Sequence, residues 1–192
     1  IIHPIAVAKI VAQKLGLGAT TIVASLLHDV VEDTEYRITD IENMFDSKVA
    51  NIVDGLTKLS GDFDLSQALT LKKILMTLSD DVRVILIKIA DRLHNMQTLD
   101  SMLPQKKLKI AGETLFLYAP LAHRLGLYAI KSELEELSFK YKHPEEYNRI
   151  IYQLHNQEEK RNYLVEEFIK PIKDRLKTEN IYCNVTHRLK ST

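Results

Sequence analysis

The run of sequence that decides the fold lies at residues 26–33 and reads Leu26-Leu27-His28-Asp29-Val30-Val31-Glu32-Asp33. Four titratable side chains follow a strongly apolar stretch, which we expect to be a helix running through Val23 toward Asp29. Positions four apart share one face of a helix, so His28 should lie over Glu32, and Asp29 over Asp33. Burying such groups without partners is costly, and a divalent cation is an effective partner for adjacent imidazole and carboxylate groups. The run therefore favours a metal site within a helical protein.

The hydrophobic period around this run is helical over nearly the whole chain. Only six Gly and five Pro occur among 192 residues, which also favours helix. We expect Thr20 or Thr21 to cap the second helix, a capping box beginning at Thr39 to open the third, and Asp80-Asp81 to cap the helix that starts at Val82. The predicted fold class is all-α, with helices near residues 4–15, 20–29, 39–45, 49–59, 66–78, 82–99, 104–118, 121–140 and 144–179.

Charge and composition exclude several classes of protein. Lys plus Arg equals Asp plus Glu at 26 each, and a neutral chain is a poor candidate for binding duplex phosphates, although a small anionic ligand remains possible. The single cysteine, Cys183, excludes an internal disulfide. No apolar stretch approaches the ~20 residues of a membrane span, and nothing resembles a signal peptide. We therefore expect a cytoplasmic protein that binds neither membrane nor nucleic acid; the sequence does not indicate an oligomeric state.

Two further side chains complete a candidate ligand set. His3 precedes the first expected helix, and Asp91 interrupts an otherwise apolar stretch of the helix from Val82. Two histidines and two aspartates form a mixed nitrogen and oxygen site suited to Mn²⁺, Fe²⁺ or Zn²⁺. Such an ion would leave room for water and a substrate oxygen, and could polarise a phosphoryl group. Each signal alone has a simpler interpretation: His3 as a helix-start residue, or Asp91 as a buried carboxylate paired with Arg92 or Arg83.

The order His, His-Asp, Asp, with the last Asp roughly sixty residues after the pair, resembles the HD phosphohydrolase superfamily. Longer sequence motifs resemble the N-terminal hydrolase domain of the bifunctional RelA/SpoT enzymes. These motifs are His3-Pro4, His28-Asp29-Val30-Val31-Glu32-Asp33-Thr34 and Ala90-Asp91-Arg92-Leu93-His94-Asn95-Met96. The stretches at 118–126 and 131–137 resemble the region that follows this domain in the same family, so the likeness covers essentially the whole chain.

The resemblance implies an activity and a cofactor. It implies hydrolysis of the 3′-pyrophosphate of ppGpp or pppGpp, a small-molecule guanosine polyphosphate of the stringent response, to GDP or GTP and pyrophosphate. His3, His28, Asp29 and Asp91 match the metal ligands of the family, whose usual ion is Mn²⁺. Two alternatives stay open: a catalytically silent regulatory HD module, and an HD phosphohydrolase that acts on another nucleotide. The intact motifs that carry the candidate ligands argue against a silent regulatory module. The resemblance after Pro104 argues against an HD phosphohydrolase that acts on another nucleotide.

Further residues receive roles through the same resemblance. Glu32 and Asp33 match a catalytic acidic pair beside the pyrophosphate that orients or deprotonates the attacking water, although on their own they could be a solvated helix end. Asn95 and Thr98 match nucleotide contacts, and the spacing of Asp91, Asn95 and Thr98 (i, i+4, i+7) places them on one helix face. Lys58, Lys72 and Lys88 could bind the polyphosphate, but we interpret them as solvated lysines. The other histidines have no ligand spacing to one another, and we interpret them as structural: His94, His123, His143, His155 and His187.

The chain is predicted to contain three parts. Residues 1–142 are expected to form an HD-type hydrolase domain that lacks its N-terminal part, and residues 143–180 a connecting helix. Residues 181–192, where apolar and polar residues alternate, are expected to be the opening strand of a truncated synthetase domain of α/β type. The basic, base-stacking loop of the family would lie upstream of Ile1, so we expect nucleotide recognition to be incomplete in this chain.

Overall fold

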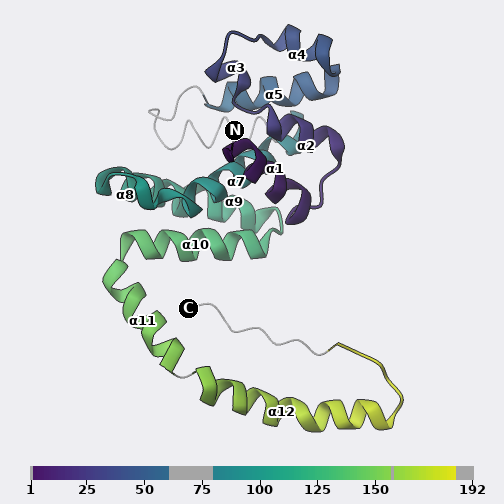
Figure 1. Ribbon diagram of the computed structural model, residues 1–192, viewed down its shortest axis with the longest axis vertical. Helices are drawn as coiled ribbons and strands as arrows, with labels where there is room; N and C mark the ends of the chain where they lie inside the picture. The colour runs from purple at the N-terminus through teal and green to yellow at the C-terminus, as the bar shows by residue number, and fades with distance from the viewer. Residues whose placement is uncertain (1, 61–79, 157, 185–192) are drawn as a thin grey trace. The chain divides into compact units, whose positions relative to one another are not determined.

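The computed structural model describes residues 2–60, 80–156 and 158–184. Every regular element in these ranges is helical, which confirms the predicted all-α class (Figure 1). The helix predicted at 66–78, together with Lys72 and His187, lies outside the described residues. The chain divides into two compact units, Ile1–Ser138 and Phe139–Thr192.

The first unit contains the helices that position the candidate site. In chain order its elements are α1 (Ile2–Gln13), α2 (Ala19–Leu26), α3 (Val30–Asp33), α4 (Ile38–Met44), α5 (Ser47–Ser60), α7 (Val82–Gln97), η1 (Leu99–Ser101), α8 (Pro104–Glu113), η2 (Thr114–Tyr118), α9 (Ala119–Arg124) and most of α10 (Tyr128–Lys142). The continuous helix predicted over 121–140 is wrong. Gly126 takes a φ of 75° between α9 and α10, a conformation that glycine adopts without steric cost and that ends a helix.

A core of interlocking helices holds the first unit together. Helix α1 packs against α2 and α7, and α5 packs against α2, α4 and α7, as Figure 1 shows for α1, α2 and α7. Each large apolar side chain buried in this way contributes ~1.5–3 kcal/mol relative to an exposed one. The largest side chains that are fully buried include Val7, Val11, Ile52, Leu56, Ile85, Ile87, Ile89, Leu93 and Met96. Helices α1 and α7 are therefore held against each other by packing that does not depend on a bound ligand.

Local capping explains where α7 begins. Asp81 lies just before the helix in an extended conformation, and its carboxylate accepts a hydrogen bond from the backbone N–H of Arg83 at 2.9 Å. This arrangement satisfies one of the free N–H groups at the helix start and confirms the predicted cap. The same carboxylate forms a 2.7 Å ion pair with the guanidinium of Arg83. The start of α7 is thus fixed by its own sequence.

Two of the other predicted caps are wrong. Helix α2 begins at Ala19 after Gly18, and Thr21 lies within the helix with its side chain buried. Helix α4 begins at Ile38, so Thr39 is already helical, and the backbone N–H of Arg37 donates to Asp40 at 2.8 Å. In both helices the true start lies upstream of the predicted cap, and at α4 a capping box between Arg37 and Asp40 accompanies it.

The second unit contains the end of α10 followed by α11 (Pro144–Asn156) and α12 (Glu158–Thr178). Residues 181–184 have no regular secondary structure, and the rest of the predicted strand, from Val185 onward, lies outside the described residues. The domain boundaries at 142 and 180 stay predictions. None of the helices in the described ranges has a stretch long and apolar enough for a membrane span.

Candidate metal centre

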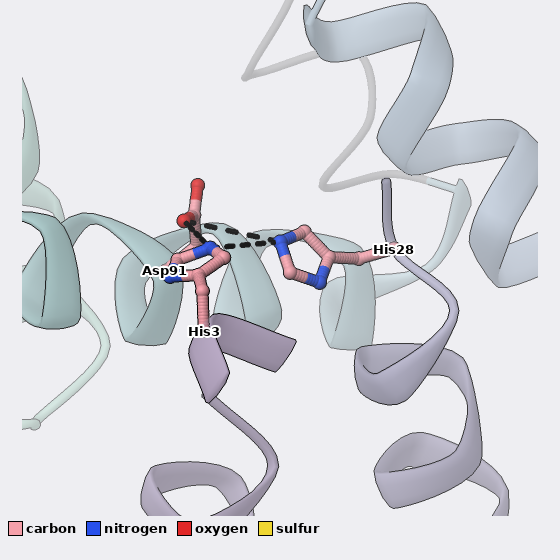
Figure 2. Close-up of side chains that lie close together, drawn as sticks. All are labelled: His3, His28 and Asp91. Carbon is pink, nitrogen blue, oxygen red and sulfur yellow. Dashed lines mark hydrogen bonds and ion pairs between the residues drawn. The ribbon is translucent and has the colours of Figure 1, made fainter. Parts of the chain in front are cut away.

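Three side chains from separate parts of the first unit converge on one point. His3 comes from the first turn of α1, His28 from the turn between α2 and α3, and Asp91 from α7 (Figure 2). His3 was expected to precede the first helix, but it lies within α1. The ligand atoms of these three residues all lie within 4.8 Å of one another. The structure thus brings together a His-His-Asp group that the sequence spreads over 89 positions.

The distances within this group are short and consistent. The Nε2 atom of His3 lies 3.2 Å from Nε2 of His28 and 3.1 Å from Oδ1 of Asp91. The Nε2 atom of His28 lies 3.9 Å from the same Asp91 oxygen. Asp29 joins the group from the neighbouring position, since its Oδ2 lies 2.9 Å from Nε2 of His28 and 3.9 Å from Nε2 of His3. His3, His28 and Asp91 thus form one group, and Asp29 contacts its two histidines.

The donor set fits a divalent cation. An ion bound by nitrogen and oxygen at ~2.0–2.2 Å places neighbouring ligand atoms roughly 3 Å apart. The observed separations of 2.9 to 3.9 Å span this value. His28 is completely buried and the Asp91 side chain is 17% exposed, so the site is shielded from water on the side of these two residues. Two imidazoles and two carboxylates in such a setting are a plausible ligand set for Mn²⁺, Fe²⁺ or Zn²⁺.

The HD dipeptide lies in a turn and not within one helix. We predicted a helix running through Leu27 toward Asp29, but α2 ends at Leu26 and α3 starts at Val30. The imidazole of His28 explains the break, because its Nδ1 lies 2.8 Å from the carbonyl oxygen of Ser25, a group that a continuing helix would use for its own backbone. When His28 is neutral and its Nδ1–H is donated to this carbonyl, its Nε2 lone pair faces the cluster.

Two neighbours on α7 contact the candidate ligands from outside. The amide Nδ2 of Asn95 donates to Oδ1 of Asp91 at 2.8 Å. The Nδ1 atom of His94 lies 2.7 Å from Nδ1 of His3. We had interpreted His94 as a structural residue, and its contact with His3 shows that it belongs to the surroundings of the site. The signal in the sequence was its position three residues after Asp91, on the same side of the helix.

The alternative pairing of Asp91 with arginine is not what the structure shows. Arg83 pairs with Asp81, while Arg92 lies 3.4 Å from the carboxylate of Glu113 and 4.3 Å from the centre of the Tyr118 ring. The carboxylate of Asp91 instead contacts His3 and the amide on the next turn.

Charge in the cluster favours the form of Asp91 that binds a cation. Burial alone would raise the pKa of its carboxyl group, but the hydrogen bond with His3 and the positive charge of Lys88 outweigh burial and lower that pKa. Burial alone would lower the pKa of His28, but its hydrogen bond with Asp29 and the charges of Asp29 and Asp91 raise it. Burial, followed by the charge of His3, lowers the pKa of His94.

Lys88 differs from our prediction that it is solvated. Its side chain is buried, one turn before Asp91 on α7. Lys58, by contrast, is 74% exposed and pairs with Asp54 at 2.5 Å, as a solvated lysine would. Because burying an ammonium group without compensation is costly, the position of Lys88 beside a buried carboxylate makes electrostatic sense.

The remaining predicted site residues lie on α3 and at the end of α7. Glu32 and Asp33 form the end of the short helix α3, and both are exposed. The backbone N–H groups of both residues donate to the carbonyl oxygen of Asp29, at 3.1 and 2.9 Å, so the acidic pair is anchored to the HD turn. Thr98 caps the C-terminal end of α7, and its hydroxyl donates to the carbonyl oxygen of His94 at 3.0 Å.

Residues 1–128 match a protein family described as the HD domain. The chain belongs to the HD domain family. An HD domain implies a divalent metal ion, and the group formed by His3, His28 and Asp91 is a possible site for it.

Curated relatives extend the likeness beyond the HD domain. Bifunctional (p)ppGpp synthase/hydrolase SpoT of Escherichia coli K12 is 43% identical over 194 residues, which cover 99% of this chain and 28% of that protein. GTP pyrophosphokinase of Myxococcus xanthus is 41% identical over 197 residues, covering 99% of this chain and 26% of that protein. Guanosine-3′,5′-bis(diphosphate) 3′-pyrophosphohydrolase of Vibrio cholerae is 49% identical over 151 residues, covering 77% of this chain and 21% of that protein.

These relatives confirm the resemblance to the RelA/SpoT enzymes. The chain spans little more than a quarter of the length of the Escherichia coli and Myxococcus proteins. The similarity therefore concerns the HD domain and the helices that follow it, and the names of the relatives refer to two different activities of longer proteins.

Proposed function

We propose that this chain hydrolyses the 3′-pyrophosphate of ppGpp or pppGpp. In this reaction a water oxygen attacks the phosphorus that is bonded to the 3′ oxygen of the ribose, and the bond between that phosphorus and the 3′ oxygen breaks. The water contributes its hydroxyl group to the departing pyrophosphate and one proton to the 3′ hydroxyl of the product. GDP or GTP and pyrophosphate result, and no co-reactant other than water is consumed.

The convergence of His3, His28, Asp29 and Asp91 is the observation that carries this proposal. The Nε2 atom of each histidine lies within 3.9 Å of a ligand atom of each of the other three residues, an arrangement suited to one shared divalent ion. The relatives named as 3′-pyrophosphohydrolases supply the substrate class, and the match to them includes the helices after the HD domain.

The four residues would hold one divalent ion, for which we propose Mn²⁺. The bound ion would supply Lewis-acid polarisation of a phosphoryl oxygen and would lower the pKa of a nearby water molecule. The carboxylates of Asp29 and Asp91 favour Mn²⁺ over softer ions, whereas the two imidazoles leave Fe²⁺ and Zn²⁺ as competitors. A metal series therefore belongs in the test.

Other side chains are assigned to proton transfer and to binding. Glu32 and Asp33, held by the HD turn through their backbone N–H groups, would orient the attacking water and accept its proton. Asn95 and Thr98 would receive the nucleotide on the exposed side of α7. In the structure both use their donor groups within α7, so we propose that their oxygen atoms accept hydrogen bonds from the substrate.

The test is the release of pyrophosphate from ppGpp by metal-stripped protein, measured without metal and with added Mn²⁺, Fe²⁺ or Zn²⁺. Product chromatography identifies GDP. The matched variants are Asp91→Asn, which removes one candidate ligand with little change in shape, and Asp54→Asn, which changes a half-buried aspartate of α5 that pairs with Lys58. We expect metal-dependent release by the wild type and by Asp54→Asn, and none by Asp91→Asn.

The other outcomes separate the alternatives. Metal binding without any pyrophosphate release would contradict hydrolysis and favour a regulatory HD module. Release of phosphate or pyrophosphate from other nucleotides, but not from ppGpp, would assign the chain to another HD phosphohydrolase activity. Equal turnover by Asp91→Asn and the wild type would remove the metal centre from the proposal.

A further inference from the structure

His94 and His3 face each other through the same kind of nitrogen atom. Their Nδ1 atoms lie 2.7 Å apart, and their rings are tilted by 50° with centroids 4.8 Å apart. A separation of 2.7 Å between two nitrogens requires a proton between them, so one ring donates and the other accepts. Helix α7 fixes this geometry because Asp91 and His94 are three residues apart on it, and α1 packs on the same helix.

The candidate metal centre determines which ring must donate. The other nitrogen of His3, Nε2, is the atom that points to His28 and Asp91. A metal ligand needs its lone pair, so His3 can bind an ion through Nε2 only when its single proton is on Nδ1. In that tautomer His3 donates from Nδ1, and His94 must accept with an unprotonated Nδ1.

We propose that His94 is a positioning residue for the metal centre, which holds His3 in the tautomer and ring orientation that direct Nε2 toward the ion. This inference rests on the metal site of the proposed function and adds a residue that does not itself touch the ion. A ligating histidine usually donates its second N–H to an oxygen atom, and here a second imidazole takes that place.

With His94 in this role, three of the four candidate ligands have a partner outside the cluster. His28 is oriented by the carbonyl oxygen of Ser25, and Asp91 by the amide of Asn95. Two of these three partners, His94 and Asn95, are consecutive residues of α7. This one helix would therefore supply a ligand, Asp91, and also the groups that orient two ligands.

The experiment compares Mn²⁺ affinity among variants that differ in the acceptor at position 94. Asn places its amide oxygen at the same distance from the backbone as the Nδ1 of His, whereas Leu fills similar space without an acceptor. We expect His94→Leu to weaken Mn²⁺ binding ~10- to 100-fold, and His94→Asn to stay within about threefold of the wild type. His123→Leu, a change of an exposed histidine on α9, is the control and should not alter the affinity.

A second measurement reads the tautomer directly and needs no turnover. Ring ¹⁵N spectra of the protein loaded with Zn²⁺, which is diamagnetic, distinguish a protonated Nδ1 from an unprotonated one. We expect His3 to carry its proton on Nδ1 in the wild type and in His94→Asn. Circular dichroism of each metal-free variant shows whether it is folded as the wild type is.

Each result decides the proposal. Unchanged Mn²⁺ affinity of folded His94→Leu overturns it, and so does a folded His94→Asn that is as weak as His94→Leu, since packing alone would then explain the residue. If His94→Leu does not fold, folded His94→Ala replaces it: Mn²⁺ affinity equal to that of the wild type overturns the proposal, and a ~10- to 100-fold loss that His94→Asn does not show supports it. A wild type that binds no metal overturns both this inference and the metal centre. Metal binding without hydrolysis overturns only the proposed function, and the Mn²⁺ affinities of the His94 variants then still decide the role of His94.

Discussion

The amide of Asn95 donates a 2.8 Å hydrogen bond to Oδ1 of Asp91, one turn earlier on α7. The same oxygen lies 3.1 Å from Nε2 of His3. Asn95 thus touches a candidate ligand, although the family resemblance places it at the nucleotide. Both roles are compatible, because the amide N–H can orient Asp91 while the amide oxygen faces outward.

Asn95→Ala is expected to weaken Mn²⁺ binding by ~10-fold, the lower end of the range for residues that support metal ligands. The reason is that Asp91 loses the donor that fixes its carboxylate. Equilibrium titration of the metal-free protein with Mn²⁺ measures this change without any nucleotide present.

Thr98→Val is the comparison for Asn95. Its hydroxyl donates to the carbonyl oxygen of His94 and lies at the end of α7, so its loss should leave Mn²⁺ affinity unchanged. If the hydroxyl also contacts the nucleotide, the KM for ppGpp rises. Equal loss of metal affinity in both variants would show that the end of α7, and not the amide of Asn95, controls Asp91.

Substitutions of the metal ligands and of the acid–base residues should affect metal binding differently. We expect Asp91→Ala and His28→Ala to abolish both metal retention and turnover, because each removes a donor atom from the cluster. Glu32→Gln should keep the metal and lose ~100- to 10,000-fold in kcat, since its carboxylate is assigned to proton transfer. Metal content after gel filtration and steady-state rates provide the two readouts, and equal metal loss in all three variants would refute this division of roles.

Asp81 provides a stability test that is independent of the metal. Its hydrogen bond with Arg83 lowers the pKa of its carboxyl group, so the charged form stabilises the folded protein. The folded pKa lies below the unfolded value of about 3.9, and the contribution is therefore complete above that value and disappears as pH falls through the folded pKa. At pH 7, Asp81→Ala should lower the free energy of unfolding by ~1 kcal/mol, the usual cost of losing an N-cap.

Urea unfolding of metal-free protein between pH 7 and pH 2.5 measures this contribution. The difference between the wild type and Asp81→Ala should shrink below about pH 4. Asp81→Asn is the matched control, because Asn caps helices as well as Asp does but carries no charge. A difference between the wild type and Asp81→Ala that stays constant with pH would contradict the electrostatic explanation.

The sequence was sufficient for the fold class, and it indicated the His-His-Asp group that the structure brings together. The helical period placed α1, α5 and α7 within a few residues of their observed bounds, and the charged cap at Asp81 was visible because capping depends on neighbouring residues only. Three of the four candidate ligands, His3, His28 and Asp91, form one group, and Asp29 lies beside its two histidines; their roles as ligands stay predictions. Patterns of this kind are local or are repeated across a family, so they can be recognised before the chain is folded.

The sequence was not sufficient where tertiary contacts compete with local rules. The end of α2 at Leu26 depends on the His28 side chain taking the carbonyl of Ser25, and an apolar run gives no sign of that competition. The burial of Lys88 and the contact of His94 with His3 depend on how α1 and α7 pack. Helical spacing places these residues on a face, but it does not show which neighbour that face meets.

The contact between α5 and α7 makes a last prediction whose sign depends on the fold. Replacing a glycine within a helix by alanine normally stabilises the protein by up to ~1 kcal/mol. At Gly55 of α5, however, an added Cβ would lie 2.8 Å from Cγ2 of Val84, a buried side chain of α7 whose branched Cβ leaves it little freedom to move. Gly55→Ala should therefore destabilise the protein by ~1–3 kcal/mol.

Gly112 of α8 is the matched control, because a Cβ there would meet no atom within 4 Å. Gly112→Ala should leave stability unchanged or raise it by up to ~1 kcal/mol. Adding Val84→Ala to Gly55→Ala should remove the clash, so the two changes together should cost less than the sum of their separate effects. Additive effects in this double-mutant cycle, measured by urea unfolding, would show that α5 and α7 do not pack through these two residues.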